Sequence, residues 1–148
     1  MGYTTEFAGQ FDLNKPLTDG DAEFLIKLSD SRRVARNMDA KYGTQGEYFV
    51  DGGINAEFFK ETVIEHNTPP SSQPSLYCQW VPTEDKSSIV WNGSEKFYQY
   101  TKWLQYLIDW LSPRGYVLNG SVDWFGENNY DRGTLIVTDN VLVSSVSY

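Results

Sequence analysis

Three arginines in the segment KLSDSRRVARNMDAKY form the leading candidate for an anion-binding site in this 148-residue chain. The segment holds five of the twelve basic residues, although the whole chain has a net charge of −8. On a helix, Arg32 and Arg36 would lie one turn apart and hold a phosphate or carboxylate together, with Arg33 beside them. The alternative is that carboxylates such as Asp30 and Asp39 pair with these arginines on an ordinary charged surface.

A second group of chemically capable residues lies in and before the segment GENNYDRG. Asp123, Glu127 and Asp131 are candidates for a general base or for a weak cation site. The spacing differs from that of a calcium-binding EF-hand loop, because Arg132 stands where that loop requires a glycine. A polar hairpin loop without chemistry is the alternative interpretation.

The segment EKFYQYTKWLQYLIDW holds six aromatic rings in sixteen residues and predicts an amphipathic helix. Its core-facing arc is Phe97, Tyr100, Leu104, Leu107, Ile108 and Leu111. Trp103, Tyr106 and Trp110 lie together on the flank of this arc and are named the aromatic flank below. If exposed, they are candidate anchors for a partner. In the alternative, they cover the first helix or the long loop.

Nucleophilic and metal-dependent chemistry find little support in the sequence. His66 is the only histidine and Cys78 the only cysteine, so no CxxC or histidine pair exists for a structural zinc. We interpret Cys78 as a buried, inert thiol within a strand. No GxSxG elbow is present, and the Gly-Gly of VDGG lacks a phosphate-binding motif. We therefore expect no metal and no cofactor, and identify no catalytic residue.

Composition narrows the classes of partner. The length suits a single domain over residues 1–148, and 40% hydrophobic with 16% aromatic residues supply a core. The charge of −8 disfavours nonspecific nucleic-acid binding and association with anionic membranes. The absence of a signal-like start, of a transmembrane-length apolar run and of a cysteine pair predicts a cytoplasmic protein.

Strict alternation in YTTEFAGQFDL predicts a half-buried strand from Tyr3 to Leu13. Thr18 is the expected N-cap of a helix over residues 19–37. Residues 40–75 form an irregular insertion with one short strand candidate, residues 48–50, and an ambiguous segment after it.

Two hairpins and a second helix are expected in the rest of the chain. One hairpin comprises residues 76–81 and 88–91, and the helix that follows begins after a cap at Ser94 and ends at Pro113 and Gly115. The C-terminal segments predict antiparallel strands. Three further tryptophans on strands are expected in the core: Trp80, Trp91 and Trp124. The order strand–helix–hairpin–helix–hairpin predicts an α+β fold, an antiparallel sheet with two helices on one face, as in ferredoxin-like proteins.

Three stretches carry a family resemblance: MGYTTEFAGQFDLNKPLT, QPSLYCQWVPTED, and EKFYQYTKWLQYLI followed by PRGYVLNGSVDWFGE. In these stretches the chain resembles a family of small, soluble bacterial and phage proteins of uncharacterised function. The resemblance covers both ends and the middle of the chain, and it implies no activity, cofactor or catalytic residue.

The leading functional hypothesis is a non-enzymatic binding module for a protein or a small anionic ligand. In a phage or mobile element, such a module would inhibit a host or defence protein, its negative charge mimicking nucleic acid. The alternative is a small enzyme for a phosphorylated or nucleotide-like substrate, with arginines on the anion and Asp123, Glu127 or Asp131 as base. A homodimer with the aromatic flank as its interface is the third hypothesis.

Overall fold

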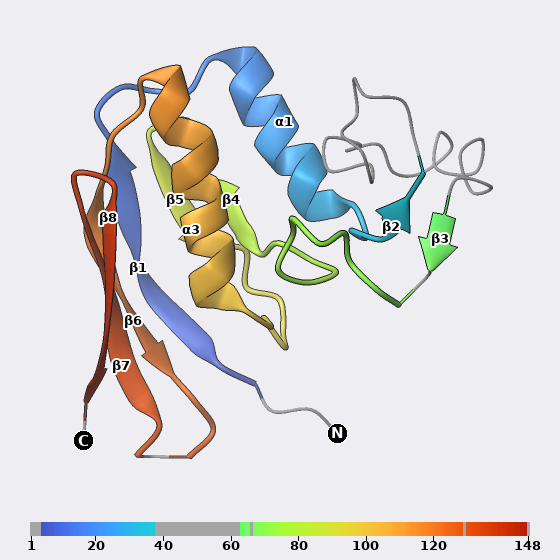
Figure 1. Cartoon of the computed structure of the whole chain (residues 1–148). Helices are drawn as coiled ribbons and strands as arrows, with labels where there is room; N and C mark the ends of the chain where they lie inside the picture. The colour runs from blue at the N-terminus through green and yellow to red at the C-terminus, as the bar shows by residue number, and fades with distance from the viewer. Residues whose placement is uncertain (1–3, 38–62, 66, 129, 148) are drawn as a thin grey trace.

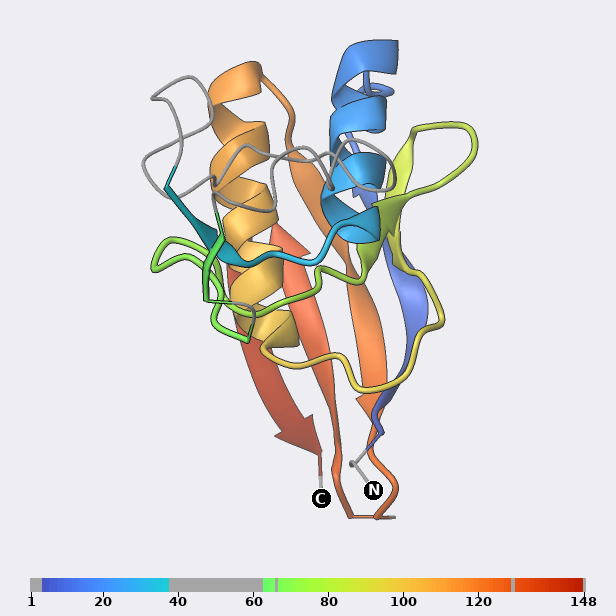
Figure 2. The same ribbon diagram turned by 90° about the vertical axis from the view of Figure 1, so that its right-hand side faces the viewer.

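The computed structural model describes residues 4–37, 63–65, 67–128 and 130–147, which form a mixed α+β fold (Figure 1). Six strands make one antiparallel sheet in the order β4-β5-β1-β6-β7-β8. Their bounds are β1 Glu6–Leu13, β4 Trp80–Pro82, β5 Ser88–Trp91, β6 Leu118–Phe125, β7 Arg132–Thr138 and β8 Val141–Ser147. Figures 1 and 2 show both long helices on the same side of this sheet.

β1 lies in the interior of the sheet, as its alternating sequence requires. It pairs along its full length with β6, from Glu6 opposite Phe125 to Leu13 opposite Leu118, and its last residues also pair with β5. Phe7 and Phe11 point to the helices and are buried. The predicted strand is confirmed from Glu6 onward, and its first residues, 1–3, lie outside the described part of the chain.

The first helix, α1 (Asp19–Asp30), begins as predicted. The Thr18 side chain accepts the Asp21 N–H at 3.1 Å. The predicted end near residue 37 is wrong, because the backbone becomes extended at Ser31. The Ser31 hydroxyl donates to the Lys27 carbonyl at 2.7 Å, which satisfies one of the free carbonyls at the helix end.

The second long helix, α3 (Tyr100–Leu111), begins later than predicted. Ser94 is not its cap, since the Ser94 N–H donates to Asn92 and the chain then forms a loop that buries Phe97. The residue before the helix, Gln99, has a left-handed backbone and no side-chain cap bond. The predicted end is confirmed: a 3-10 turn, η3 (Ser112–Arg114), follows, and Gly115 closes it with φ of 85°.

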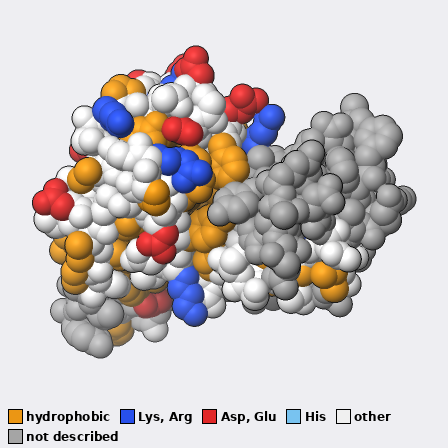
Figure 3. All heavy atoms as spheres, turned by 45° about the horizontal axis from the view of Figure 1, so that its top comes forward, with side chains coloured by type: hydrophobic (Ala, Val, Ile, Leu, Met, Phe, Trp, Pro, Cys, Tyr) orange, Lys and Arg blue, Asp and Glu red, His pale blue; other side chains and the backbone are white. Residues whose placement is uncertain are grey.

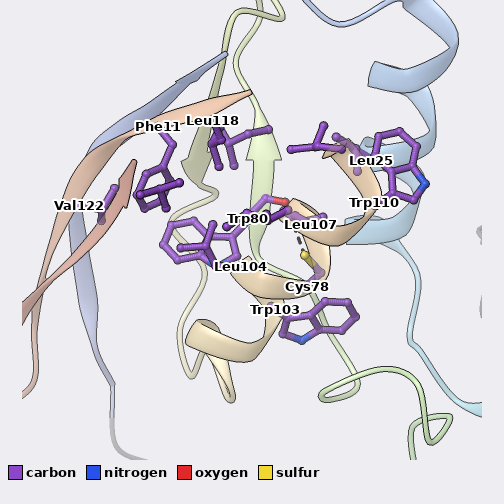
Figure 4. Close-up of a cluster of buried hydrophobic side chains, with 14 of the residues drawn as sticks. Phe11, Leu25, Cys78, Trp80, Trp103, Leu104, Leu107, Trp110, Leu118 and Val122 are labelled. Carbon is purple, nitrogen blue, oxygen red and sulfur yellow. Dashed lines mark hydrogen bonds between the residues drawn. The ribbon is translucent and has the colours of Figure 1, made fainter. Parts of the chain in front are cut away.

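The core lies between the sheet and the two helices. The predicted helix arc is buried in it, with Tyr100 partly exposed at its margin. Trp80 and Trp124 are buried as predicted, whereas Trp91 is half-buried against the core. Figure 4 shows Phe11, Trp80 and Leu118 meeting Leu104 and Leu107 of α3.

The segment between α1 and β4 contributes a second, two-stranded sheet. β2 (Ala35–Arg36) pairs antiparallel with β3 (Val63–Glu65). The predicted strand at residues 48–50 lies outside the described residues. Residues 76–79 are not strand as predicted, and β4 begins only at Trp80. Leu76 instead gives its carbonyl to the Arg33 N–H at 2.6 Å, so this segment runs beside the residues that follow α1.

The C-terminal antiparallel strands are confirmed as β6, β7 and β8, joined in sequence. Among the residues that the structure describes, no helix combines the length and the apolar character that crossing a bilayer requires.

Gly120 is required where β6 crosses β1, because its φ is 145° and a Cβ there would lie 2.6 Å from the Gln10 carbonyl oxygen. We expect Gly120→Ala to lower the free energy of unfolding by about 1–3 kcal/mol, measured by urea denaturation. Gly20→Ala is the control, because a Cβ at Gly20, within α1, meets nothing within 4 Å. Equal stability of the two variants would contradict a backbone requirement at Gly120.

Candidate functional site

The three arginines lie in the extended chain after α1, not on a helix. Arg33 is 2% exposed and Arg36 is 8% exposed. Burial lowers the pKa of Arg36. Arg32 is exposed and donates to the Tyr77 hydroxyl at 3.3 Å and to the Asn67 side-chain oxygen at 3.0 Å. All three therefore contact groups within the chain, and two of them are removed from solvent.

Arg33 is joined to the aromatic flank through one buried glutamine. Its Nε donates to the Gln73 side-chain oxygen at 3.0 Å, and the Gln73 amide donates to the Tyr106 hydroxyl at 3.1 Å. Gln73 is 4% exposed. The arginine segment and the flank thus meet inside the molecule, and the residue that joins them lies in a loop where the sequence carries no motif.

The aromatic flank packs against other parts of the same chain. Trp103 is fully buried, and its Nε1 donates to the Ser75 hydroxyl at 2.7 Å. Trp110 is 8% exposed and stacks on Phe24 of α1, with ring centroids 5.0 Å apart. Figure 4 shows Trp110 beside α1 and Trp103 at a separate position along α3. Neither tryptophan offers an exposed ring, and the flank covers α1 and the loop, as the alternative interpretation expects.

The carboxylates of the second candidate group lie around the hairpin between β6 and β7. Asp123, on β6, accepts the Thr134 hydroxyl at 2.8 Å, and Glu127 accepts the Thr4 N–H at 2.8 Å. The Asp131 backbone closes the turn through Gly126 at 2.7 Å. In the described ranges, no three histidine, cysteine, aspartate or glutamate side chains are grouped so as to hold a metal ion.

The structure separates the arginines from these carboxylates. β2, which carries Arg36, lies beyond the end of α1, whereas the β6–β7 hairpin lies at the far end of the main sheet (Figures 1 and 2). A pocket in which arginine binds an anion beside a carboxylate base needs both groups within several ångströms. The described elements do not provide that arrangement.

Cys78 is buried and lies two residues before β4, so its predicted position within a strand is wrong. Its Sγ faces the Trp80 carbonyl oxygen at 3.6 Å (Figure 4). Burial raises the pKa of Cys78 from 9.0 to about 12. The thiolate that a nucleophile requires is therefore disfavoured.

The side of the main sheet away from α1 and α3 carries no described helix (Figures 1 and 2). We name this side the open face. Alternation along the strands and their register bring the following residues to it: Glu6, Ala8, Gln10, Asp12, Asn119, Ser121, Asp123, Phe125, Arg132, Thr134, Ile136, Thr138, Val141 and Val143. Carboxylates occupy β1 and β6, whereas apolar side chains gather on β7 and β8. Three of these apolar side chains are 40–62% exposed and are named the apolar edge patch: Ile136, Val141 and Val143.

A hollow of about 430 Å³ adjoins the open face where β1 and β6 end, lined by three glutamates and one aromatic ring. Glu6 and Phe125 stand opposite each other on neighbouring strands, Glu95 comes from the loop before α3, and Glu127 follows β6. Phe125 is 42% exposed. The sequence analysis missed Glu6, Glu95 and Phe125 as site residues, although Glu6 is on the outward half of the alternating β1 pattern.

A second hollow, of about 340 Å³, lies beside the end of α3 and is lined by Tyr106, Asp109, Trp110, Pro113 and Arg114. The Arg114 guanidinium lies 4.0 Å from the centre of the Trp110 ring and donates to the Trp110 carbonyl at 2.7 Å. Figure 3 shows acidic and basic side chains interspersed on the end of the molecule that faces the viewer. That end therefore presents no continuous acidic surface resembling a nucleic acid.

Comparison of the chain with protein-family models, with curated proteins and with solved structures found no match. The resemblance to bacterial and phage proteins stays a prediction. The functional argument below accordingly depends on the geometry of the open face and of the hollow beside it.

Arg33 is predicted to support the fold. Arg33→Ala would leave buried Gln73 without this donor, so we expect the free energy of unfolding to fall by about 1–3 kcal/mol. Lys102→Ala, on the exposed side of α3, is the control and should change it by less than about 0.5 kcal/mol. Urea denaturation monitored by tryptophan fluorescence measures both, and an Arg33 effect no larger than the control would refute the structural role.

Cys78 is predicted to resist alkylation in the folded protein. With a pKa raised to about 12, the native thiol stays protonated, and the free energy of unfolding should fall as pH rises above 9.0, where the unfolded thiol ionises. Mass spectrometry after iodoacetamide treatment should show modification only in denaturant. Lys102→Cys supplies an exposed thiol as the control, and equally rapid labelling of Cys78 would contradict its burial.

Proposed function

We propose that this chain is a non-enzymatic binding module that recognises a protein partner through the open face. The observation that carries this proposal is the exposure of one whole side of a six-stranded sheet, with carboxylates on β1 and β6 and apolar side chains on β7 and β8. A broad surface of mixed character suits a protein, whereas small ligands are usually enclosed in a concave pocket.

A protein partner is favoured over a small anionic ligand because of the position of the arginines. Arg33 and Arg36 are buried, and Arg32 donates to Tyr77 and Asn67. An anion at this segment would have to replace contacts that already exist within the chain. The open face needs no such rearrangement.

The chemistry of the hollow indicates a basic partner. Glu6, Glu95 and Glu127 line it, and the exposed ring of Phe125 lies among them. A lysine or arginine of the partner would meet carboxylates there, and its charge would also be attracted by the ring face. The apolar edge patch would exclude water from the rest of the contact.

We infer a ferredoxin-like arrangement for the core of the fold. The inference is supported by the strand order β4-β5-β1-β6, in which α1 comes between β1 and β4 and α3 comes between β5 and β6. β7 and β8 would then be an extension of that arrangement beyond β6. The open face of the proposed module corresponds to its helix-free side.

The biological setting is proposed from the sequence alone. The resemblance supports a bacterial or phage protein acting in the cytoplasm, with a host or defence protein as a plausible class of target. The charge of −8 argues against nonspecific binding to nucleic acid, since phosphate and carboxylate groups repel each other. The competing proposal, an enzyme for phosphorylated substrates, has no support from the separated arginines and carboxylates.

Charge removal on the open face tests the proposal. We expect Glu6→Gln and Asp123→Asn to weaken binding to a captured basic protein by about threefold to tenfold, and to reduce the salt dependence of binding. Glu84→Gln, in the exposed β4–β5 turn, removes the same charge elsewhere and serves as the control. The measurement is surface plasmon resonance of immobilised chain against a panel of purified basic bacterial proteins. Failure of every panel member to bind, or equal loss in all three variants, would refute the proposed face.

A further inference from the structure

The edge formed by β8 is open in the part of the chain that the structure describes. β8 pairs with β7 along its length, from Thr138 opposite Val141 to Arg132 opposite Ser147, and no described strand pairs with its other side. Its sequence, VLVSSVS, holds no charged residue. On the open face, Val141 is 62% exposed and Val143 is 55% exposed.

The two edges of the main sheet differ in how they resist pairing. Exposed edge strands are normally protected by shortness, charged side chains, proline or bulges, because their free N–H and C=O groups attract other strands. β4 at the opposite edge is three residues long, ends in Pro82 and contacts α1. β8 has seven residues and none of the charges, prolines or register shifts that protect an edge.

We propose that β8 pairs antiparallel with β8 of a second copy of this chain, joining the two sheets edge to edge. Charge identifies the occupant. A second copy also has a net charge of −8 and is repelled elsewhere, but the uncharged β8 strands let the backbones approach without opposing carboxylates. An antiparallel strand pair is also compatible with the two-fold symmetry that most homodimers have.

The geometry predicts a weak, concentration-dependent dimer. A strand of seven residues is about 24 Å long, so a backbone ladder alone covers less surface than a standard interface of about 800 Å² per partner. The apolar edge patch adds side-chain contact, because Ile136 stands opposite Val143 and Thr138 opposite Val141 beside the joining edge. The two open faces would become one continuous surface. The inference depends on the edge and not on the proposed protein partner.

Sedimentation equilibrium of the full chain over a wide concentration range tests the inference. We expect reversible dimerisation, and we expect Val143→Lys to weaken it by about tenfold or more, because each copy would place a positive charge at the joined edge. Ser121→Lys puts the same charge on the open face but on the interior strand β6, and serves as the control. Val141→Lys is a second edge variant, and circular dichroism verifies that each variant is folded.

Three outcomes would overturn the inference. The first is a monomer at every concentration, and this includes the case in which a peptide from another protein protects β8 amides from hydrogen exchange while the chain alone stays monomeric. The second is a dimer that neither Val143→Lys nor Val141→Lys weakens. The third is a dimer that Ser121→Lys weakens as much as the edge variants do. Loss of partner binding in Glu6→Gln with dimerisation intact would separate this inference from the proposed function.

Discussion

The contacts of one ring, Phe7, connect the centre of the sheet to the rest of the fold. The ring of Phe7 lies 5.2 Å from that of Trp80, 5.3 Å from Trp91, 5.8 Å from Phe97 and 5.0 Å from Tyr100. These four partners come from β4, β5, the loop before α3 and α3 itself. Edge-to-face ring pairs contribute about 0.5–1.5 kcal/mol each beyond burial. The same contacts determine the register of β1, since a slip by one residue would move Phe7 to the open face.

A core on one side of the sheet explains how this chain combines many aromatic residues with a strongly negative charge. The large rings fill the space between the sheet and the two helices, so the open face is left to short polar residues, carboxylates and a few aliphatic side chains. Antiparallel sheets are commonly covered on one side only. The surface available to a partner is therefore determined by which residues the core does not use, rather than by a motif of its own.

Local patterns predicted the elements well, but not the site. Alternation identified β1, and Thr18 marked the start of α1, because both signals depend on residues within a few positions of each other. The start of α3 was misplaced because the bond from Ser94 to Asn92 competes with a helix cap. The burial of Trp103 and Arg33 depends on a loop distant in sequence, whose Ser75 and Gln73 side chains complete their contacts. Periodicity carries no information on such long-range partners.

The short, proline-terminated edge at β4 sets an upper limit on how far any association through strands can proceed. Growth of a fibre by edge addition needs an acceptor at each end of every sheet, so that each new molecule presents a fresh site. Pro82 lacks a backbone N–H, and β4 offers only three residues. A sheet with a single receptive edge terminates after one addition. The asymmetry between β4 and β8 thereby protects a chain rich in β-structure from open-ended aggregation.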